Sequence, residues 1–228
     1  MIPWQRLDRK QAPDGTELEL RRRGHEFLIL AGGYDLMSSE DESSSRALAD
    51  LGCRHIDRVA SARVLVGGLG MGFTLRAALD VTGPRAVIEV AELVPAVAEW
   101  NRHELAALAG HPLDDRRAAL LLEDVRAPIK RARSRYDAIL LDVDNGPDAL
   151  AHPTNAAIYG RGGLEQAWSA LRPGGVLGVW SFSDERRFTD RLNAQGFDVN
   201  VCRVHGSRKG RGRYHWIWIA TRPGAALA

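Results

Sequence analysis

The 228-residue sequence lacks most features that mark secreted, membrane-bound or nucleic-acid-binding proteins. It has only two cysteines, Cys53 and Cys202, and without paired metal-ligand spacing we expect them to be buried apolar residues in a reducing compartment. Its net charge of +2 gives no bulk attraction to nucleic acid or membrane surfaces. No apolar run reaches the ~20 residues of a membrane span, and the first residues lack the apolar core of a signal peptide. We therefore expect a soluble cytoplasmic protein that binds neither nucleic acid nor membranes.

A glycine cluster between an apolar strand and a helix organises the chain. Residues 63–67 predict a short buried strand, and residues 72–81 predict the helix that follows it. Gly67, Gly68 and Gly70 lie between them, at a turn where the backbone takes positive φ or approaches a ligand closely. Such a turn aims free backbone N–H groups at whatever lies beyond the end of the strand. A tight turn needs glycine with or without a ligand, so the cluster alone is a weak signal.

Glu89 strengthens the prediction of a ligand site. It closes the next apolar run, which begins at Ala86, and it lies about 20 positions after the glycines, where a ribose-binding carboxylate belongs. A carboxylate can accept hydrogen bonds from both ribose hydroxyls. The glycine cluster and Glu89 together predict a nucleoside-binding site.

The order of the predicted elements indicates an α/β fold. From residue 56 onward, strands alternate with helices, which is typical of a parallel sheet covered on both faces. Two strands at 197–204 and 214–220 follow each other without a helix, so they predict an antiparallel hairpin at one edge. This layout is that of class I S-adenosylmethionine (SAM)-dependent methyltransferases: a Rossmann-like, mostly parallel seven-stranded sheet with a C-terminal antiparallel hairpin. The other strands are expected at 63–67, 85–90, 118–122, 137–142 and 175–181, and the helices near 72–81, 92–109, 125–132, 161–171 and 184–194.

The first 57 residues differ in character from the rest. Residues 16–37 alternate polar and apolar side chains between glycine turns, which predicts a β-hairpin followed by a further short strand. Residues 43–51 predict a connecting helix. We therefore divide the chain into an N-terminal β segment with its linking helix, residues 1–57, and a Rossmann-like SAM-binding domain, residues 58–228. A ribbon of this size is marginal alone and leaves edges that invite pairing, so we expect a homodimer or larger oligomer.

Acidic residues close three successive strands of the predicted sheet. Ligands of such sheets bind at the carboxyl ends of the strands, so these residues are candidates for chemistry. Beside Glu89, Asp124 follows the third strand, where it either accepts from an adenine amino group or caps the next helix. Asp142 ends the fourth strand, where a carboxylate can take a proton from an attacking amine and stabilise a sulfonium cation. Asp144 is either a second anionic partner or a residue of the Asp-Asn-Gly-Pro turn.

Several motifs carry a family resemblance: Val64–Gly72, Val87–Val90, Glu123-Asp124, Tyr136–Asp142 and Leu171–Leu177. They make the chain resemble the spermidine synthase family of aminopropyltransferases, a branch of the class I SAM-binding fold, from about residue 16 to residue 204. The resemblance implies that Glu89 binds the ribose, Asp124 binds the adenine and Asp142 handles the attacking amine. It also implies that Tyr159 lines the pocket, and that the N-terminal segment helps to form a subunit interface.

The acceptor side departs from that family's pattern. The family has a stretch that reads roughly Arg-Asp-Glu-Phe-x-Tyr-His-Glu, whereas residues 40–47 keep only the acidic pair Asp41-Glu42. The second Asp of the family's Asp-x-x-Asp loop is Asn145 here, and Arg46 would repel a polycation. The resemblance therefore implies an unchanged donor site and an altered acceptor site.

The sequence leaves three functions open. The first is alkyl transfer, in particular aminopropyl transfer, from SAM or decarboxylated SAM to a small-molecule acceptor such as an amine. The second is methyl transfer from SAM to a small molecule on the same scaffold, and the third is a non-catalytic binding module that kept the fold. Methylthioadenosine as the by-product would indicate aminopropyl transfer, and S-adenosylhomocysteine would indicate methyl transfer. No metal site is expected, because His103, His111 and His152 lack metal-ligand spacing.

Overall fold

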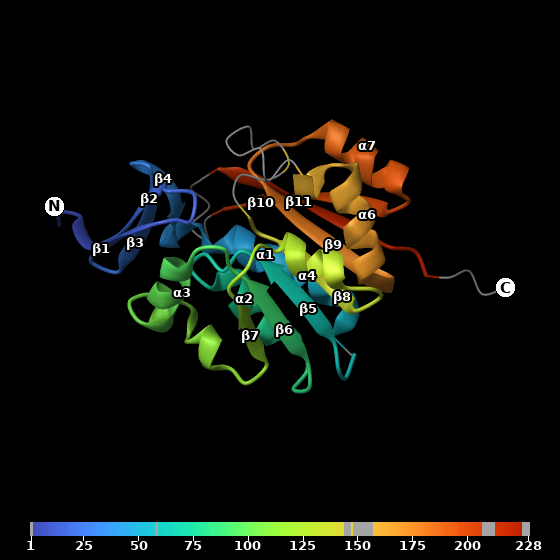
Figure 1. The fold of residues 1–228 in the computed structure, drawn as a ribbon, viewed down its shortest axis with the longest axis horizontal. Coiled ribbons are helices and arrows are strands. Elements are labelled where there is room, and N and C mark those ends of the chain that lie inside the picture. Colours follow the sequence, from blue (N-terminus) through green and yellow to red (C-terminus); the bar gives the residue numbers. More distant parts are fainter. Residues whose placement is uncertain (1, 58, 144–146, 148–156, 207–212, 225–228) are drawn as a thin grey trace.

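A small β-sheet and a larger sheet covered by helices make up the described part of the chain (Figure 1). The structure is a computed structural model, and it describes residues 2–57, 59–143, 147, 157–206 and 213–224. The strands are β1 Gln5–Gln11, β2 Glu17–Arg23, β3 Glu26–Ala31, β4 Tyr34–Ser38, β5 Arg63–Gly67, β6 Val87–Ala91, β7 Ala118–Leu121, β8 Tyr136–Leu141, β9 Leu171–Ser181, β10 Asp198–His205 and β11 Tyr214–Thr221. The α-helices are α1 Glu42–Cys53, α2 Phe73–Val81, α3 Pro95–Arg102, α4 Arg126–Arg131, α6 Arg161–Ala170 and α7 Arg186–Gln195.

The larger sheet has the predicted architecture. Its seven strands lie in the order β10-β11-β9-β8-β5-β6-β7. The pairs from β9 to β7 are parallel, whereas β11 is antiparallel to both β9 and β10. The prediction of a mostly parallel seven-stranded sheet with a C-terminal antiparallel hairpin is confirmed. None of the helices that the structure describes is long and apolar enough to cross a membrane.

Alternating side chains of the large sheet enter two hydrophobic cores. Val64 and Val66 of β5 belong to the core under α1, α2 and α3, and Leu65 between them belongs to the core under α4, α6 and α7. The sheet is therefore covered on both faces, which explains why its strands read as continuous apolar runs. One predicted helix, 92–109, is shorter than expected, because α3 begins only at Pro95 and ends at Arg102, and a separate 3-10 helix follows at Ala106–Ala109.

The helix α1 packs directly on the large sheet. A Cβ atom at Gly52 would lie 2.4 Å from Leu140 Cδ2 of β8, so glycine allows this close approach. Leu48 and Ala49 of the same helix are fully buried in the core with α2. The expected domain boundary after residue 57 therefore follows a helix that covers the large sheet, and this boundary stays a prediction. The packing brings the start of α1 to the edge where the parallel strands end.

The N-terminal sheet has one more strand than expected. Its antiparallel order is β1-β2-β3-β4, and β1 was missed because its sequence is polar at nearly every position. β1 is an edge strand, largely exposed, so no alternation marks it. Leu20 and Ile29 of the central strands are fully buried in the core shared with α2 and α3. Trp100 Nε1 of α3 also donates to Asp8 of β1 at 2.8 Å, so the small sheet is anchored to the larger domain.

Candidate active site

The glycine turn brings the end of β5 against the end of β8. Gly68 has a φ of +85°, and a Cβ atom there would lie 2.4 Å from the carbonyl oxygen of Asp142. The Asp142 N–H donates to the carbonyl oxygen of Gly67 at 2.9 Å. Gly70 also has a positive φ, of +52°, and faces the sulfur of Met37 in β4. The turn therefore fixes Asp142 directly beside the glycine cluster.

Hydroxyl groups hold the Asp142 carboxylate. Thr74 Oγ1 in the first turn of α2 donates to Asp142 Oδ2, and the hydroxyl of Ser45 in α1 also hydrogen-bonds to this carboxylate. No cationic side chain among the described residues forms an ion pair with it. Burial raises the pKa of the Asp142 carboxyl, and the hydrogen bonds from Thr74 and Ser45 partly offset this rise. A carboxylate with a raised pKa accepts a proton more readily, which suits a general base.

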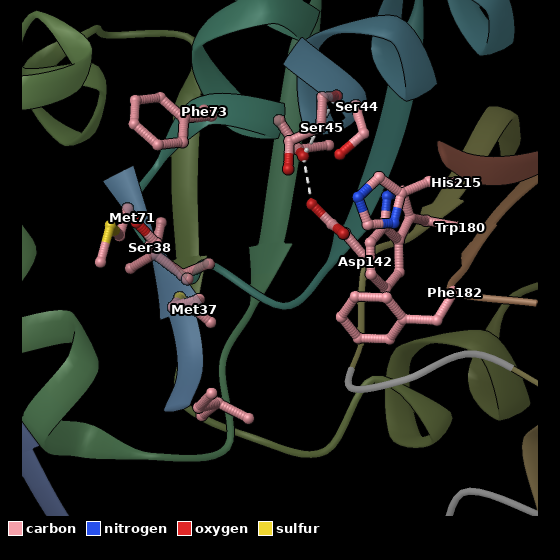
Figure 2. A pocket seen from close by; sticks show the side chains of 14 residues that line it. Met37, Ser38, Ser44, Ser45, Met71, Phe73, Asp142, Trp180, Phe182 and His215 are labelled. Carbon is pink, nitrogen blue, oxygen red and sulfur yellow. Dashed lines mark hydrogen bonds between the residues drawn. The ribbon is translucent and has the colours of Figure 1, made fainter. Parts of the chain in front are cut away.

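A cavity of about 110 Å³ opens beside Asp142 (Figure 2). This volume corresponds to several water molecules rather than one, so part of a ligand can enter it. Its lining comes from β4, the starts of α1 and α2, the glycine turn and the edge where β8 and β9 end and β11 begins. The residues of this Asp142 cavity are Leu36, Met37, Ser38, Ser44, Ser45, Leu69, Gly70, Met71, Phe73, Thr74, Asp142, Trp180, Phe182 and His215.

The sequence analysis missed the aromatic residues that β9 and β11 bring to the cavity. Trp180 and Phe182 lie at the carboxyl end of β9, so the same strand-end rule that selected Asp142 could have found them. His215 lies at the start of β11, and this strand runs antiparallel to β9, with Ile217 paired to Trp180. An antiparallel neighbour brings its first residues to the edge where parallel strands end, and this is the signal that would have found His215.

Glu89 does not lie at the edge with Asp142. It is opposite Leu65 in the parallel pairing, and β6 continues to Ala91, so the expectation that Glu89 closes the strand is corrected. Its carboxylate accepts a hydrogen bond from Tyr136 Oη at 2.6 Å and forms an ion pair with Arg135. Burial and the hydrogen bond to Glu89 raise the pKa of the Tyr136 hydroxyl. Binding of a ribose by Glu89 stays a prediction, but the carboxylate already has two partners away from the glycine turn.

Glu92 is the carboxylate that follows β6 at the glycine turn. It is 7% exposed, its Oε2 accepts from the Leu69 N–H at 3.0 Å, and its Oε1 accepts from the Val94 N–H at 2.8 Å. The sequence analysis missed it because Glu89 ended the apolar run first. Pro95 is the signal in the sequence that could have identified Glu92. Proline favours the first turn of a helix, so a helix that starts at Pro95 implies that the preceding strand ends near Glu92.

Asp124 lies before α4, where the sequence analysis left two roles open. Its Oδ1 accepts from the backbone N–H of Arg126 at 2.8 Å, as a helix cap does. The Arg126 guanidinium also binds both carboxylate oxygens, at 2.6 Å for the closest contact, and these hydrogen bonds lower the pKa of Asp124. The cap is therefore present, and an adenine contact stays a prediction.

The remaining candidates lie outside the cavity lining. Tyr159 is 2% exposed and packs edge-on against Phe188, with 5.6 Å between ring centroids, in the core under α6 and α7. Its role as a pocket residue stays a prediction. Asp144 and Asn145 lie outside the described residues. Arg46, expected to repel a polycation, is 3.6 Å from Glu42 and 3.9 Å from Asp80 and does not line the cavity.

Metal ligands do not gather in the described part of the chain: no three His, Cys, Asp or Glu side chains there form a group that could hold an ion. The site instead offers a glycine turn, two carboxylates at strand ends, Glu92 and Asp142, and an aromatic wall. These groups suit an organic ligand with hydroxyls and a positive centre.

The sheet order and the site at the strand ends define a Rossmann-like protein of the class I methyltransferase fold. A spermidine synthase from Thermotoga maritima matches this structure with a TM-score of 0.75 and 15% identity, over 98% of this chain and 75% of that one. A spermidine synthase in complex with the transition state analogue AdoDATO gives a TM-score of 0.74 and 15% identity, over 98% of this chain and 74% of that one. The fold is therefore spermidine synthase-like, as the resemblance implied.

Sequence similarity points in the same direction. The chain is 37% identical over 131 residues to polyamine aminopropyltransferase 2 of Pseudomonas aeruginosa. The matched region is 54% of this chain but only 35% of that relative, so the chain spans about a third of the relative's length. No protein-family model matches the sequence. The protein is thus spermidine synthase-like in fold and, over about half of its length, in sequence.

Proposed function

We propose that this protein is a transferase that moves the aminopropyl group of decarboxylated SAM to an amine acceptor. The observation that carries the proposal is the Asp142 carboxylate, held beside the glycine turn at the edge of the sheet and facing a cavity. Similarity to an aminopropyltransferase and to the fold of spermidine synthases supports it. The acceptor would be a small molecule.

The donor would lie along the edge formed by the glycine turn and Glu92. Glu92 lies there, with its Oε2 accepting from the Leu69 N–H and its Oε1 accepting from the Val94 N–H. These two hydrogen bonds hold the carboxylate at the glycine turn, where a ribose hydroxyl could donate to it. We assign the ribose to Glu92 in preference to Glu89, because Glu92 is bonded to the glycine turn through Leu69, whereas Glu89 is bonded to Tyr136 and Arg135 away from it. The Asp124 region, next along the edge, is the proposed place for the adenine.

Asp142 would act on the acceptor. The amine nitrogen attacks the carbon next to the sulfonium, the carbon–sulfur bond breaks, and its electron pair stays on sulfur to leave methylthioadenosine. The proton that the amine must lose goes to Asp142, whose raised pKa suits a proton acceptor. Thr74 and Ser45 would keep the carboxylate oriented, so that positioning and electrostatics supply most of the rate enhancement.

Methyl transfer from SAM is the second candidate. Asp142 is the one acidic side chain in the described lining of the cavity, which favours an acceptor with few positive charges and so weakens the case for a polyamine. The donor's adenosine part would bind in the same way in both reactions. The two functions therefore differ in the by-product and not in the proposed roles of Glu92 and Asp142.

Self-association through the N-terminal sheet is a further part of the proposal. Its outer strands β1 and β4 each have one unpaired edge within the described residues, and Tyr34 of β4 is 82% exposed. A homodimer would cover these edges. Sedimentation should give about twice the chain mass of 25.0 kDa at micromolar concentrations, and a monomer throughout that range would contradict this part.

Calorimetric titration tests the donor site. The proposal predicts saturable binding of decarboxylated SAM and of methylthioadenosine to the full chain. Binding of neither these compounds nor SAM at millimolar concentration would overturn the transferase function. Binding without turnover of any amine would instead support the non-catalytic module that the sequence left open.

A further inference from the structure

The Asp142 cavity has an aromatic side that the proposed proton transfer does not use. The rings of Trp180 and His215 are stacked with 4.8 Å between centroids and 29° between planes. Phe182 lies edge-on to Trp180 at 4.6 Å and tilted against His215 at 5.2 Å. Figure 2 shows these three rings gathered on one side of Asp142, opposite the side chains from β4. The cavity thus has one acidic group next to an aromatic wall.

Two nitrogen atoms of this wall have no hydrogen-bond partner among the described residues. They are Trp180 Nε1 and His215 Nδ1, and each atom has almost no surface exposed to solvent. The residues themselves are buried, with 9% of Trp180 and 3% of His215 exposed. A buried polar atom without a partner destabilises a protein by about 1–3 kcal/mol, so nearly all such atoms in proteins are paired. Two such atoms in the lining of one cavity indicate that a molecule bound in the cavity supplies their hydrogen-bond partner.

The chemistry of the indole restricts this partner. The Trp180 Nε1–H group can only donate, so its partner must supply an acceptor atom. An alkylammonium group has only donors and cannot satisfy it. His215 can either donate or accept in its neutral form, and burial, together with the nearby charge of Arg213, lowers its pKa and favours that form. A hydroxyl oxygen can accept from Trp180 and donate to His215 at once, and a carbonyl oxygen can accept from both.

The rest of the lining restricts the ligand's charge. Among the described residues of the lining, Asp142 is the one acidic side chain, and no Lys or Arg is among them. Met37, Met71 and Phe73 add apolar surface. A single carboxylate can compensate one amine, whereas the second ammonium of a diamine would have no second carboxylate in the described lining and would face the N–H donor of Trp180. The cavity therefore suits a molecule with one amine end and one neutral oxygen end.

We propose that the acceptor is an amine that carries a hydroxyl or carbonyl oxygen on an apolar linker, with its nitrogen at Asp142 and its oxygen at Trp180 and His215. This inference rests on the proposed transferase function and specifies its substrate class. Trp180 and His215 then distinguish amino alcohols and related monoamines from the diamines that resemble them in length.

A pair of matched acceptors tests the proposal. 1,4-Diaminobutane and 4-aminobutan-1-ol have the same chain length and differ only in whether the far end is an ammonium or a hydroxyl. With decarboxylated SAM as donor, the full-length protein should use the amino alcohol with a kcat/KM at least about tenfold higher, the value of one well-placed hydrogen bond. Equal use, or a preference for the diamine, would overturn the proposal.

Variants connect this preference to the indole nitrogen. Trp180→Phe removes the N–H and keeps an aromatic ring, so it should reduce the preference for the amino alcohol by about tenfold. Trp218→Phe is the matched control, because Trp218 Nε1 donates to Thr189 Oγ1 at 2.8 Å in the core on the other face of the sheet. That variant should keep the preference of the wild type. If Trp180→Phe does not fold, the preference of the wild-type protein between the two acceptors decides alone.

Nuclear magnetic resonance gives an independent readout. In the presence of methylthioadenosine, 4-aminobutan-1-ol should shift the indole N–H signal of Trp180, which is identified by its loss in Trp180→Phe. If neither acceptor moves this signal, the nitrogen binds a buried water only and the proposal is wrong. Failure of methylthioadenosine to bind at all would remove the transferase function as well, whereas binding of the donor with preferred use of the diamine would remove only this inference.

Discussion

Two aspartates at opposite ends of strand β8 have contrasting surroundings. Asp137, near the start of the strand, accepts from the Arg63 N–H at 2.7 Å and from the Arg172 guanidinium at 2.8 and 2.9 Å. Asp142, just after the end of the strand, is bonded by the hydroxyls of Thr74 and Ser45, and no cation among the described residues pairs with it. Among the described residues, the fold thus pairs the Asp137 carboxylate with a cation and gives the Asp142 carboxylate only hydroxyl partners.

The difference separates structural from functional carboxylates in one strand. Asp137 links the starts of β8, β5 and β9, because Arg63 begins β5 and Arg172 belongs to β9. Asp142 is at the edge where the parallel strands end, and a cavity opens next to it. Burial disfavours its charged form, which is unfavourable for stability and favourable for a proton acceptor. The comparison therefore predicts that mutations at the two ends change different properties.

The largest expected effect is on catalysis at Asp142. Asp142→Asn keeps the size of the side chain and removes its ability to take a proton, so kcat/KM should fall on the order of 10²–10⁴-fold. Methylthioadenosine affinity should stay within a few-fold of the wild type, since the ribose and adenine contacts remain. Steady-state kinetics and calorimetry measure the two quantities. An Asp142→Asn enzyme with normal turnover would make Asp142 a structural residue like Asp137.

The next effect extends the comparison to the two glutamates of the β6 region. Glu92→Gln should weaken binding of methylthioadenosine by about tenfold to a hundredfold, because it loses charge-assisted hydrogen bonds to the ribose hydroxyls. Glu89→Gln, the matched control, should change this affinity little, since Glu89 binds Tyr136 and Arg135. Calorimetric titration of both variants with methylthioadenosine measures the two affinities. The reverse order would return the ribose to Glu89 and reject the assignment of Glu92.

A smaller effect is expected on stability at Asp137. Asp137→Ala removes three hydrogen bonds from a carboxylate with a side-chain exposure of 12%, whereas Arg172 is 39% exposed and can turn to solvent. The loss should therefore be only about 2 kcal/mol, or about 4–8 °C in Tm. Thermal unfolding at neutral pH measures this. Asp142→Asn should not lower Tm, and a fall of similar size would remove the contrast between the two ends.

The smallest expected effect is a pH dependence of the difference in stability between Asp142→Asn and the wild type. The pKa of Asp142 is raised in the folded protein, so the folded state holds this proton more tightly than the unfolded chain. Stability is therefore lost as pH rises from the unfolded pKa through the folded one. Asp142→Asn does not titrate, so its stability relative to the wild type should increase from acidic to neutral pH. Urea unfolding of both proteins at several pH values tests the sign, and a constant difference would contradict the raised pKa.

The sequence predicted the large sheet well because buried parallel strands leave a strong pattern. Strands 63–67 and 137–142 match β5 and β8 within one residue at each end, since apolar runs between glycines or charged residues have clear limits. β1 had no such pattern. Its seven residues are polar except for Leu7, and ion pairs with β2, such as that of Arg6 with Glu19, replace core packing.

The site was only partly predictable for a related reason. Position at a strand end identified Asp142, but the end of β6 was ambiguous because Glu89 interrupts an apolar strand that continues to Ala91. The Glu89 carboxylate is bonded by Tyr136 and Arg135, and both residues are distant from Glu89 in sequence. Prediction of His215 as a cavity residue required the direction of β11 relative to β9. The hairpin pattern implies that β11 is antiparallel, but the search for site residues considered only the ends of the parallel strands.

The central claim is that the carboxyl end of β8 carries a site for aminopropyl transfer, and identification of the by-product tests it most directly. The wild-type protein would be incubated with SAM, decarboxylated SAM and small amines, and the adenosyl products would be separated and weighed by mass spectrometry. The account predicts accumulation of methylthioadenosine, and its near-complete loss in Asp142→Asn but not in Asp137→Ala below the Tm of that variant. S-adenosylhomocysteine alone, or neither by-product, would contradict it.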